Sequence, residues 1–87
     1  MDIIWTSKFK RDYKKITKQK KDIELLRKVL NILAAGDQLP QNYLNHPLMG
    51  QYNGYQECHI PPDWLLIYQY TEDTLVVYRT GSHSELF

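Results

Sequence analysis

The hydrophobic pattern of this chain changes period near residue 36, and this change limits the folds that it can adopt. Before that point, apolar residues recur at the three-to-four-residue spacing of amphipathic helices; these are Phe9, Tyr13 and Ile16, then Ile23, Leu26, Leu30 and Leu33 with Leu25, Val29 and Ile32 beside them. After it, three short apolar runs have the composition of strands. An αα-hairpin laid on one face of a small sheet buries both apolar surfaces most simply. The pattern therefore predicts a two-layer α+β fold.

Turn and capping residues give the expected boundaries of these elements. Thr6 or Ser7 can cap a first helix, and a second helix is predicted from about Lys21 to Ala35, closed by Gly36. Strands are expected at 3–5, 55–60, 64–70 and 75–80, with a long loop over 37–53. The predicted order is β-α-α-β-β-β with a mainly antiparallel sheet. All 87 residues, 1–87, are expected to form a single domain.

The polar turn between the last two predicted strands leaves their register open. A two-residue loop, Glu72-Asp73, turns Asp63 away from Arg79 and His83. A three-residue loop centred on Asp73 places Asp63 opposite His83, with Arg79 on the same face, because side chains alternate along a strand. The clustering of functional residue types favours the second register.

Charge is distributed unevenly along the chain. Residues 1–40 contain ten Lys or Arg against five Asp or Glu, whereas residues 41–87 contain one against five. A basic helical face serves either as a footprint for a nucleic-acid backbone or as a solvated surface that keeps a protein soluble. The density of basic residues between Lys8 and Lys28 favours the footprint, with Lys14, Lys15 and Lys18 as the expected contacts.

Several classes of protein are excluded by what the chain lacks. Cys58 is the single cysteine, so there is neither a disulfide framework nor a thiolate metal cluster, and a buried apolar role is expected for it. No apolar run approaches the length of a membrane span, and the N-terminus lacks the layout of a signal peptide. We therefore expect a cytoplasmic location and no membrane partner.

The residues that carry chemistry gather in the second half of the chain. His46, His59 and His83 lie there with Asp63 and Arg79, which is the one arginine of that half. RNA carries its own nucleophile, the 2′-OH, so its cleavage needs a base, an acid and positive charge for the phosphorane. Asp63 or His46 is a candidate base, His83 the candidate acid, and Arg79 offers a planar fork for phosphate oxygens. His59 is expected to add a second cation or to orient the phosphate.

Two aromatic residues are candidates for stacking on unpaired bases, Trp64 and the terminal Phe87. A core position is the favoured alternative for Trp64, because Leu66 and Tyr68 share its strand face. Phe87 must either pack against the domain or contact a ligand.

The acid–base residues have simpler alternatives. His46 can be a loop residue bonded to backbone, Asp63 can form a turn, and Arg79 can pair with Glu57. A zinc hydrolase using His46, His59 and His83 is disfavoured because no close-spaced ligand pair such as HExxH is present and Arg79 would repel the cation. No metal and no other cofactor is expected.

The motifs NHPLMG, ECHIPPDW, LLIY and RTGSHSELF together resemble the YafQ-type toxins of the RelE/ParE superfamily, the ribonucleases of bacterial type II toxin–antitoxin systems. The resemblance covers nearly the whole chain. It implies a ribosome-dependent endoribonuclease that cuts mRNA in the ribosomal A site, and a cognate antitoxin through which any DNA contact would be made. The functional positions of that family fall here on matching residue types: His46, His59, Asp63, Arg79, His83 and Phe87. A non-catalytic relative, inhibiting gyrase or binding RNA, is the alternative.

Overall fold

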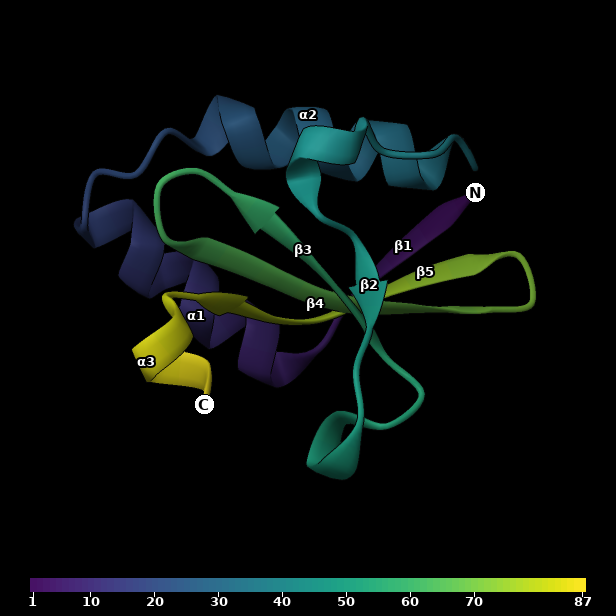
Figure 1. Cartoon of the computed structure of the whole chain (residues 1–87). Helices are drawn as coiled ribbons and strands as arrows, with labels where there is room; N and C mark the ends of the chain where they lie inside the picture. Colours follow the sequence, from purple (N-terminus) through teal and green to yellow (C-terminus); the bar gives the residue numbers. More distant parts are fainter.

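A computed structural model describes residues 1–87 as one five-stranded sheet with two main helices (Figure 1). In chain order the elements are β1 (Asp2–Trp5), α1 (Ser7–Lys18), α2 (Ile23–Ala34), η1 (Gln41–Tyr43), β2 (His46–Pro47), η2 (Gly50–Tyr52), β3 (Gln56–Ile60), β4 (Trp64–Thr71), β5 (Thr74–Gly81) and α3 (His83–Leu86). The strands lie in the order β1-β5-β4-β3-β2, and β1 runs parallel to β5 while the other pairs are antiparallel. The α+β class and the mainly antiparallel sheet are confirmed.

The two main helices begin and end where their side chains satisfy free backbone groups. The Thr6 hydroxyl accepts the Phe9 N–H at 3.1 Å, and the Asp22 carboxylate accepts the Glu24 N–H at 3.1 Å. Gly36 closes α2 at a φ of +79°, a conformation that glycine adopts without strain. The predicted start of the second helix, Lys21, is slightly early because Asp22 caps it.

The two helices cover one face of the sheet. Their apolar residues and those of β3, β4 and β5 form a core of 13 buried residues. A smaller cluster lies on the opposite face, and its four buried members are Tyr52, Leu65, Ile67 and Leu86. That second face is therefore covered by η2, α3 and aromatic side chains instead of by a helix layer, which leaves room for a site.

The β4–β5 hairpin contains both of the registers that the sequence allowed. Its turn is the two-residue loop, because Thr71 lies opposite Thr74. A β-bulge between Ile67 and Tyr68 then shifts the pairing by one residue, so that Ile67 lies opposite Arg79. The three-residue loop was wrong, but the register favoured on functional grounds is present at the far end of the hairpin.

The segment predicted as an unstructured loop contains η1, β2 and η2. Its short strand β2 pairs with β3, so that His46 lies opposite Glu57 on a strand instead of in a loop. The C-terminal helix α3 was also not predicted, and it begins with a capping box in which Ser82 and Glu85 each accept the other's backbone N–H. No helix is both long enough and apolar enough to cross a membrane.

Candidate active site

The second face of the sheet gathers polar residues from three strands in one row, with an apolar residue of β4 between them. His46 of β2 lies opposite Glu57 of β3, Glu57 opposite Ile67 of β4, and Ile67 opposite Arg79 of β5. Directly opposed residues point to the same face, and three strand spacings make this row about 14 Å long. His59 follows Glu57 by two residues and shares its face. The hairpin bulge brings Arg79 into this row.

Glu57 holds two of the predicted histidines together. Its side chain is almost fully buried, and its Oε2 lies 3.0 Å from His46 Nε2 and 3.1 Å from His59 Nε2. Its Oε1 is buried without any hydrogen-bond partner. The two imidazole rings lie 5.7 Å apart between centroids. This buried carboxylate of β3 therefore links His46 of β2 to His59 of its own strand.

The two imidazoles differ in how many of their ring nitrogens have a partner within the chain. His46 Nδ1 lies 2.8 Å from the Leu44 carbonyl oxygen, which can only accept a hydrogen bond. Both ring nitrogens of His46 thus face acceptors. His59 uses Nε2 toward Glu57, and its Nδ1 makes no hydrogen bond within the chain. His46 therefore makes the backbone contact that the simpler alternative expected, and it also contacts a carboxylate. Nδ1 of His59 remains available to a ligand.

The same three residues could hold a metal ion. One ligand atom from each of His46, Glu57 and His59 lies within 4.8 Å of the others. His83 is not a member of this group, so the three histidines are not gathered as one set of ligands. Nitrogen and carboxylate ligands of this kind suit zinc and other transition metals.

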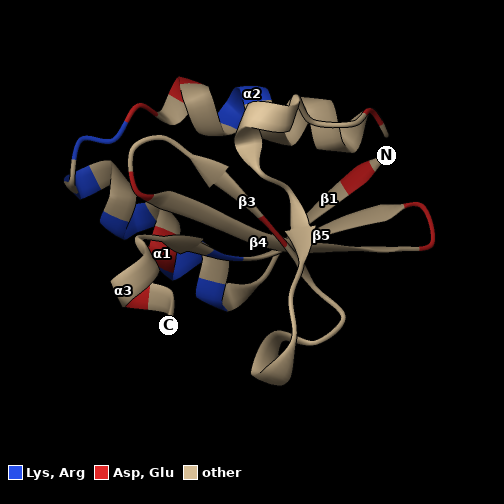
Figure 2. Ribbon diagram, viewed as in Figure 1, with Lys and Arg blue, Asp and Glu red and all other residues tan.

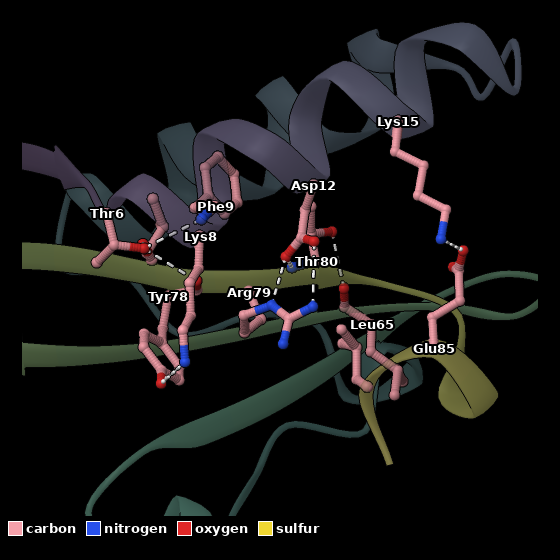
Figure 3. Close-up of polar contacts among 12 residues, drawn as sticks. Thr6, Lys8, Phe9, Asp12, Lys15, Leu65, Tyr78, Arg79, Thr80 and Glu85 are labelled. Atoms are coloured by element: carbon pink, nitrogen blue, oxygen red, sulfur yellow. Dashed lines mark hydrogen bonds and ion pairs between the residues drawn. The ribbon is translucent and has the colours of Figure 1, made fainter.

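Arg79 is held by α1 at the other end of the row (Figure 3). Its Nε donates to Asp12 Oδ2 at 2.6 Å and its Nη2 to Asp12 Oδ1 at 3.2 Å. Asp12 Oδ2 also accepts the Thr80 N–H at 3.1 Å. The hydrogen bonds that it donates to Asp12 raise the pKa of Arg79 above its usual value. The alternative pairing of Arg79 with Glu57 is wrong, and one carboxylate orients both the guanidinium and the backbone beside the bulge.

The predicted acid lies in α3, just beyond the end of β5. The His83 N–H donates to Asp63 Oδ1 at 3.2 Å, so these two residues are neighbours, as the favoured register requires. The His83 ring is stacked on Phe87 at 5.1 Å, and its nitrogens make no hydrogen bond within the chain. Phe87 also meets Tyr52 edge-on at 5.2 Å while remaining 52% exposed. It packs on one side and offers the other to solvent.

Trp64 does not belong to the accessible surface. It is 3% exposed within the helix-side core, and its Nε1 donates to Thr80 Oγ1 at 2.8 Å. The predicted stacking of Trp64 on a base is therefore wrong, and the core alternative is right. Core residues and the Lys21 side chain, whose Nζ lies 5.7 Å from the ring centre, leave no face of Trp64 for a nucleotide.

The predicted basic footprint is divided between two faces of α1. Lys and Arg residues follow α1, the connection to α2 and α2 itself (Figure 2). Lys14 and Lys18, four residues apart on one helix face, are exposed and make no ion pair. Lys15 lies on the face toward α3, where its Nζ is 2.6 Å from Glu85 Oε2.

Glu85 connects α3 to the rest of the domain, and this contact is expected to depend on pH. Contact with Lys15 and the two Ser82 hydrogen bonds lower the pKa of Glu85 to about 2. A depressed folded-state pKa adds stability above the ordinary value of 4.5, and this stability is lost as the pH falls toward about 2. We expect Glu85→Gln to lower stability by about 1 kcal/mol at neutral pH, as capping substitutions typically do.

Thermal unfolding of the intact chain and of Glu85→Gln between neutral pH and the acid limit measures this effect. The difference in melting temperature should be constant above pH 4.5 and should shrink toward zero near pH 2. A matched Glu72→Gln change in the exposed β4–β5 turn should produce no such difference. A constant difference at every pH would contradict the assignment.

Three carboxylates of the site were missed or misassigned by sequence reasoning. Glu57 was considered only as a partner of Arg79, although its spacing of two residues from His59 indicated a shared strand face. Asp12 was not considered, and its signal was a lone acid within a strongly basic run. The position of Glu85 three residues after Ser82 matched a capping box.

Comparison with known proteins identifies the family. The chain matches, over residues 1–87, the family model described as bacterial toxin of type II toxin-antitoxin system, YafQ. The mRNA interferase toxin YafQ of Escherichia coli K12 is 38% identical over 87 residues, which are 99% of this chain and 95% of that protein.

Solved structures agree with this assignment. YafQ in the E. coli DinJ-YafQ complex superposes with a TM-score of 0.91 at 38% identity, covering 99% of this chain and 97% of that one. A metal-bound toxin from Helicobacter pylori superposes with a TM-score of 0.92 at 44% identity, covering 100% and 99%. This chain is a member of the YafQ family of type II toxin–antitoxin toxins.

Proposed function

We propose that this chain is a ribosome-dependent endoribonuclease that inhibits translation by cutting mRNA through metal-independent transesterification. The observation that carries the proposal is the presence, on one face of the sheet and at its end, of two histidines with unengaged ring nitrogens and one oriented arginine. These are His59, His83 and Arg79. The E. coli relative is named an mRNA interferase toxin, which supports the same class of reaction.

Each step of the reaction has a residue suited to it. His59 Nδ1 accepts the proton of the 2′-OH, and Glu57 steadies the resulting imidazolium through Nε2. The 2′-oxygen forms a bond to phosphorus while the bond from phosphorus to the 5′-oxygen breaks. His83 gives its proton to that leaving oxygen. The products are a 2′,3′-cyclic phosphate and a 5′-hydroxyl, so no water and no metal enters this step.

Positive charge for the pentacoordinate phosphorane comes from Arg79. Arg79 uses Nε and Nη2 on Asp12, which leaves three N–H groups of its fork for phosphate oxygens. His46, held by the Leu44 carbonyl and Glu57 at the other end of the row, positions that carboxylate. A donor stabilises charge most when it is oriented beforehand, as Asp12 orients Arg79. Asp63 holds His83 by its backbone and acts as a positioning residue.

A metal ion bound at His46, Glu57 and His59 would not serve this reaction. Coordination through His59 Nε2 places the ring proton on Nδ1, which removes the lone pair that accepts the 2′-OH proton. The resemblance to a metal-bound toxin therefore does not require metal catalysis in this chain.

The partners follow from the same family. YafQ of E. coli is seen in complex with DinJ, and we propose that a cognate antitoxin binds and inhibits this chain. An acidic segment that folds on binding would complement the basic helices α1 and α2. DNA contact is expected only through that complex, and the ribosome and its mRNA place the active protein in the cytoplasm.

Ribosome dependence predicts an effect of Lys14 and Lys18, which have no partner within the chain. Charge reversal, Lys14→Glu with Lys18→Glu, is expected to weaken binding to ribosomes and to make its dependence on salt concentration shallower. With fewer contacts to phosphates, binding releases fewer counterions from the RNA. The free protein should cut naked RNA poorly. Sedimentation with ribosomes across a salt series measures both affinity and slope.

The matched control is the double change Lys20→Glu with Lys28→Glu, which alters net charge equally outside α1. Its effect should be clearly smaller. Unchanged ribosome affinity in the α1 variant would remove the basis for a ribosomal footprint on this helix.

A further inference from the structure

A cavity of about 300 Å³ lies between α1 and β5 at the Arg79 end of the row of polar residues, and Arg79 contributes to its lining. Five residues line it, none of them apolar: Lys8, Arg11, Asp12, Lys15 and Arg79. We call it the α1–β5 pocket. Its lining has four cations and one carboxylate, and it is at the lower end of the range of about 300–1,000 Å³ for small-molecule sites.

Three cations of the pocket lie on one face of α1. Residues 8, 11 and 15 follow the three-to-four-residue repeat of a helix face, and Asp12 lies on the same face. Asp12 turns toward β5 and takes the Nε and Nη2 edge of Arg79 (Figure 3). The single acid of the pocket is therefore already neutralised by Arg79, and the remaining three cations have no acid of the lining to pair with.

Two of these cations, Lys8 and Arg11, have no carboxylate partner and remain available for an anion. Lys8 Nζ is 3.2 Å from the Tyr78 hydroxyl and 5.4 Å from the centre of its ring, so a neutral group holds it beside the bulge. Arg11 makes no ion pair and no side-chain hydrogen bond. Lys15 is the exception, because Glu85 pairs with it from outside the lining.

We propose that the α1–β5 pocket binds a phosphate of an RNA backbone, distinct from the phosphate that is cleaved. A wholly polar, cationic lining excludes apolar ligands, and guanidinium and ammonium groups are the usual donors to phosphate oxygens. One scissile phosphodiester carries one negative charge, which Arg79 already matches in the proposed reaction. Lys8 and Arg11 line the α1 side of the pocket, opposite Arg79 of β5. A neighbouring phosphate of the same RNA strand, or a phosphate of ribosomal RNA, can sit between them. The inference rests on the proposed function, because the pocket would give the RNA a second point of attachment to the protein.

The test uses the full chain and the double variant Lys8→Gln with Arg11→Gln. Lys15 is left unchanged because its pairing with Glu85 also positions α3. The matched control, Arg27→Gln with Lys28→Gln on α2, removes one arginine and one lysine outside the pocket. A second variant, Lys8→Arg with Arg11→Lys, keeps both charges. Melting temperatures verify that all three remain folded.

The first probe is a short 2′-O-methylated RNA, which keeps the phosphates but lacks the nucleophile, bound in fluorescence-anisotropy titrations at several salt concentrations. The pocket variant should bind on the order of tenfold more weakly, with a salt slope shallower by about 0.7 for each lost phosphate contact of a single strand. The charge-keeping variant should bind like the unaltered chain. This result assigns the phosphate to the substrate strand.

The second probe is the vacant ribosome, without mRNA. Weaker binding of the pocket variant to ribosomes alone, with unchanged binding to the oligonucleotide, assigns the phosphate to ribosomal RNA. Affinities equal to those of the α2 control in both titrations would overturn the proposal, since the effect would then be one of net charge. Cleavage by the unaltered chain on programmed ribosomes is measured separately, because its absence would refute the proposed function without deciding the pocket.

Discussion

Replacement of His83 with alanine is expected to lower the rate of mRNA cleavage on the order of a hundredfold or more, the usual scale for removal of a general acid. The change removes an imidazole whose nitrogens have no partner within the chain. It keeps the backbone N–H that donates to Asp63, and alanine is a good helix former in α3. The fold should therefore survive, with a melting temperature close to that of the unaltered protein.

Single-turnover cleavage on programmed ribosomes measures this effect, with the product ends assigned and a chelator of transition metals present. The proposed mechanism predicts a 5′-hydroxyl and a 2′,3′-cyclic or 3′-phosphate, whereas a metal-activated water typically leaves a 5′-phosphate. Ser84→Ala, the neighbouring change in the same helix, should cleave normally. Full activity in His83→Ala, or a 5′-phosphate product, would refute the assigned chemistry while leaving the fold intact.

Replacement of Glu57 with glutamine is expected to have an effect of similar size on cleavage and a measurable effect on stability. A neutral amide cannot balance the charge of the imidazolium that forms at His59. Its NH₂ group must either face the two imidazole nitrogens now held by Oε2 or take the buried position of Oε1, where it leaves an unpartnered donor at a cost of about 1–3 kcal/mol. We therefore expect a lower kcat with little change in KM.

The controls for Glu57 separate chemistry from folding. Glu57→Asp keeps the charge and should recover part of the activity, and Glu72→Gln makes the same chemical change at an exposed turn. The pH–rate profile of Glu57→Gln should differ in shape from that of the unaltered chain, because the groups that exchange protons have lost their common partner. A profile of unchanged shape with reduced stability would mean that Glu57 has only a structural role.

The helices, the long strands and the chemical inventory of the site could be predicted from the sequence because their signals are local. Apolar spacing placed α1 and α2, and Thr6 and Gly36 marked their limits. Alternation placed β3, β4 and β5. The short elements β2 and α3 were missed because two to four residues carry too little periodicity to be distinguished from a loop.

Which residues lie opposite one another on the second face of the sheet depends on the pairing of distant segments. Tyr78 becomes the extra residue of a bulge, and this one-residue shift puts Arg79 opposite Ile67 and Asp63 next to His83. No local pattern specifies that shift, because both registers satisfy the alternation of the hairpin.

Partnership and burial were likewise long-range outcomes. Asp12 meets Arg79 across 67 residues of chain, and Glu57 meets His46 because β2 returns beside β3. Trp64 is enclosed only when both helices pack on the sheet. Local sequence patterns are enough to identify which groups are available and which elements carry them. Which groups contact one another depends on the packing of distant segments. The folded chain adopts the arrangement that buries much apolar surface and also gives the buried polar atoms hydrogen-bond partners.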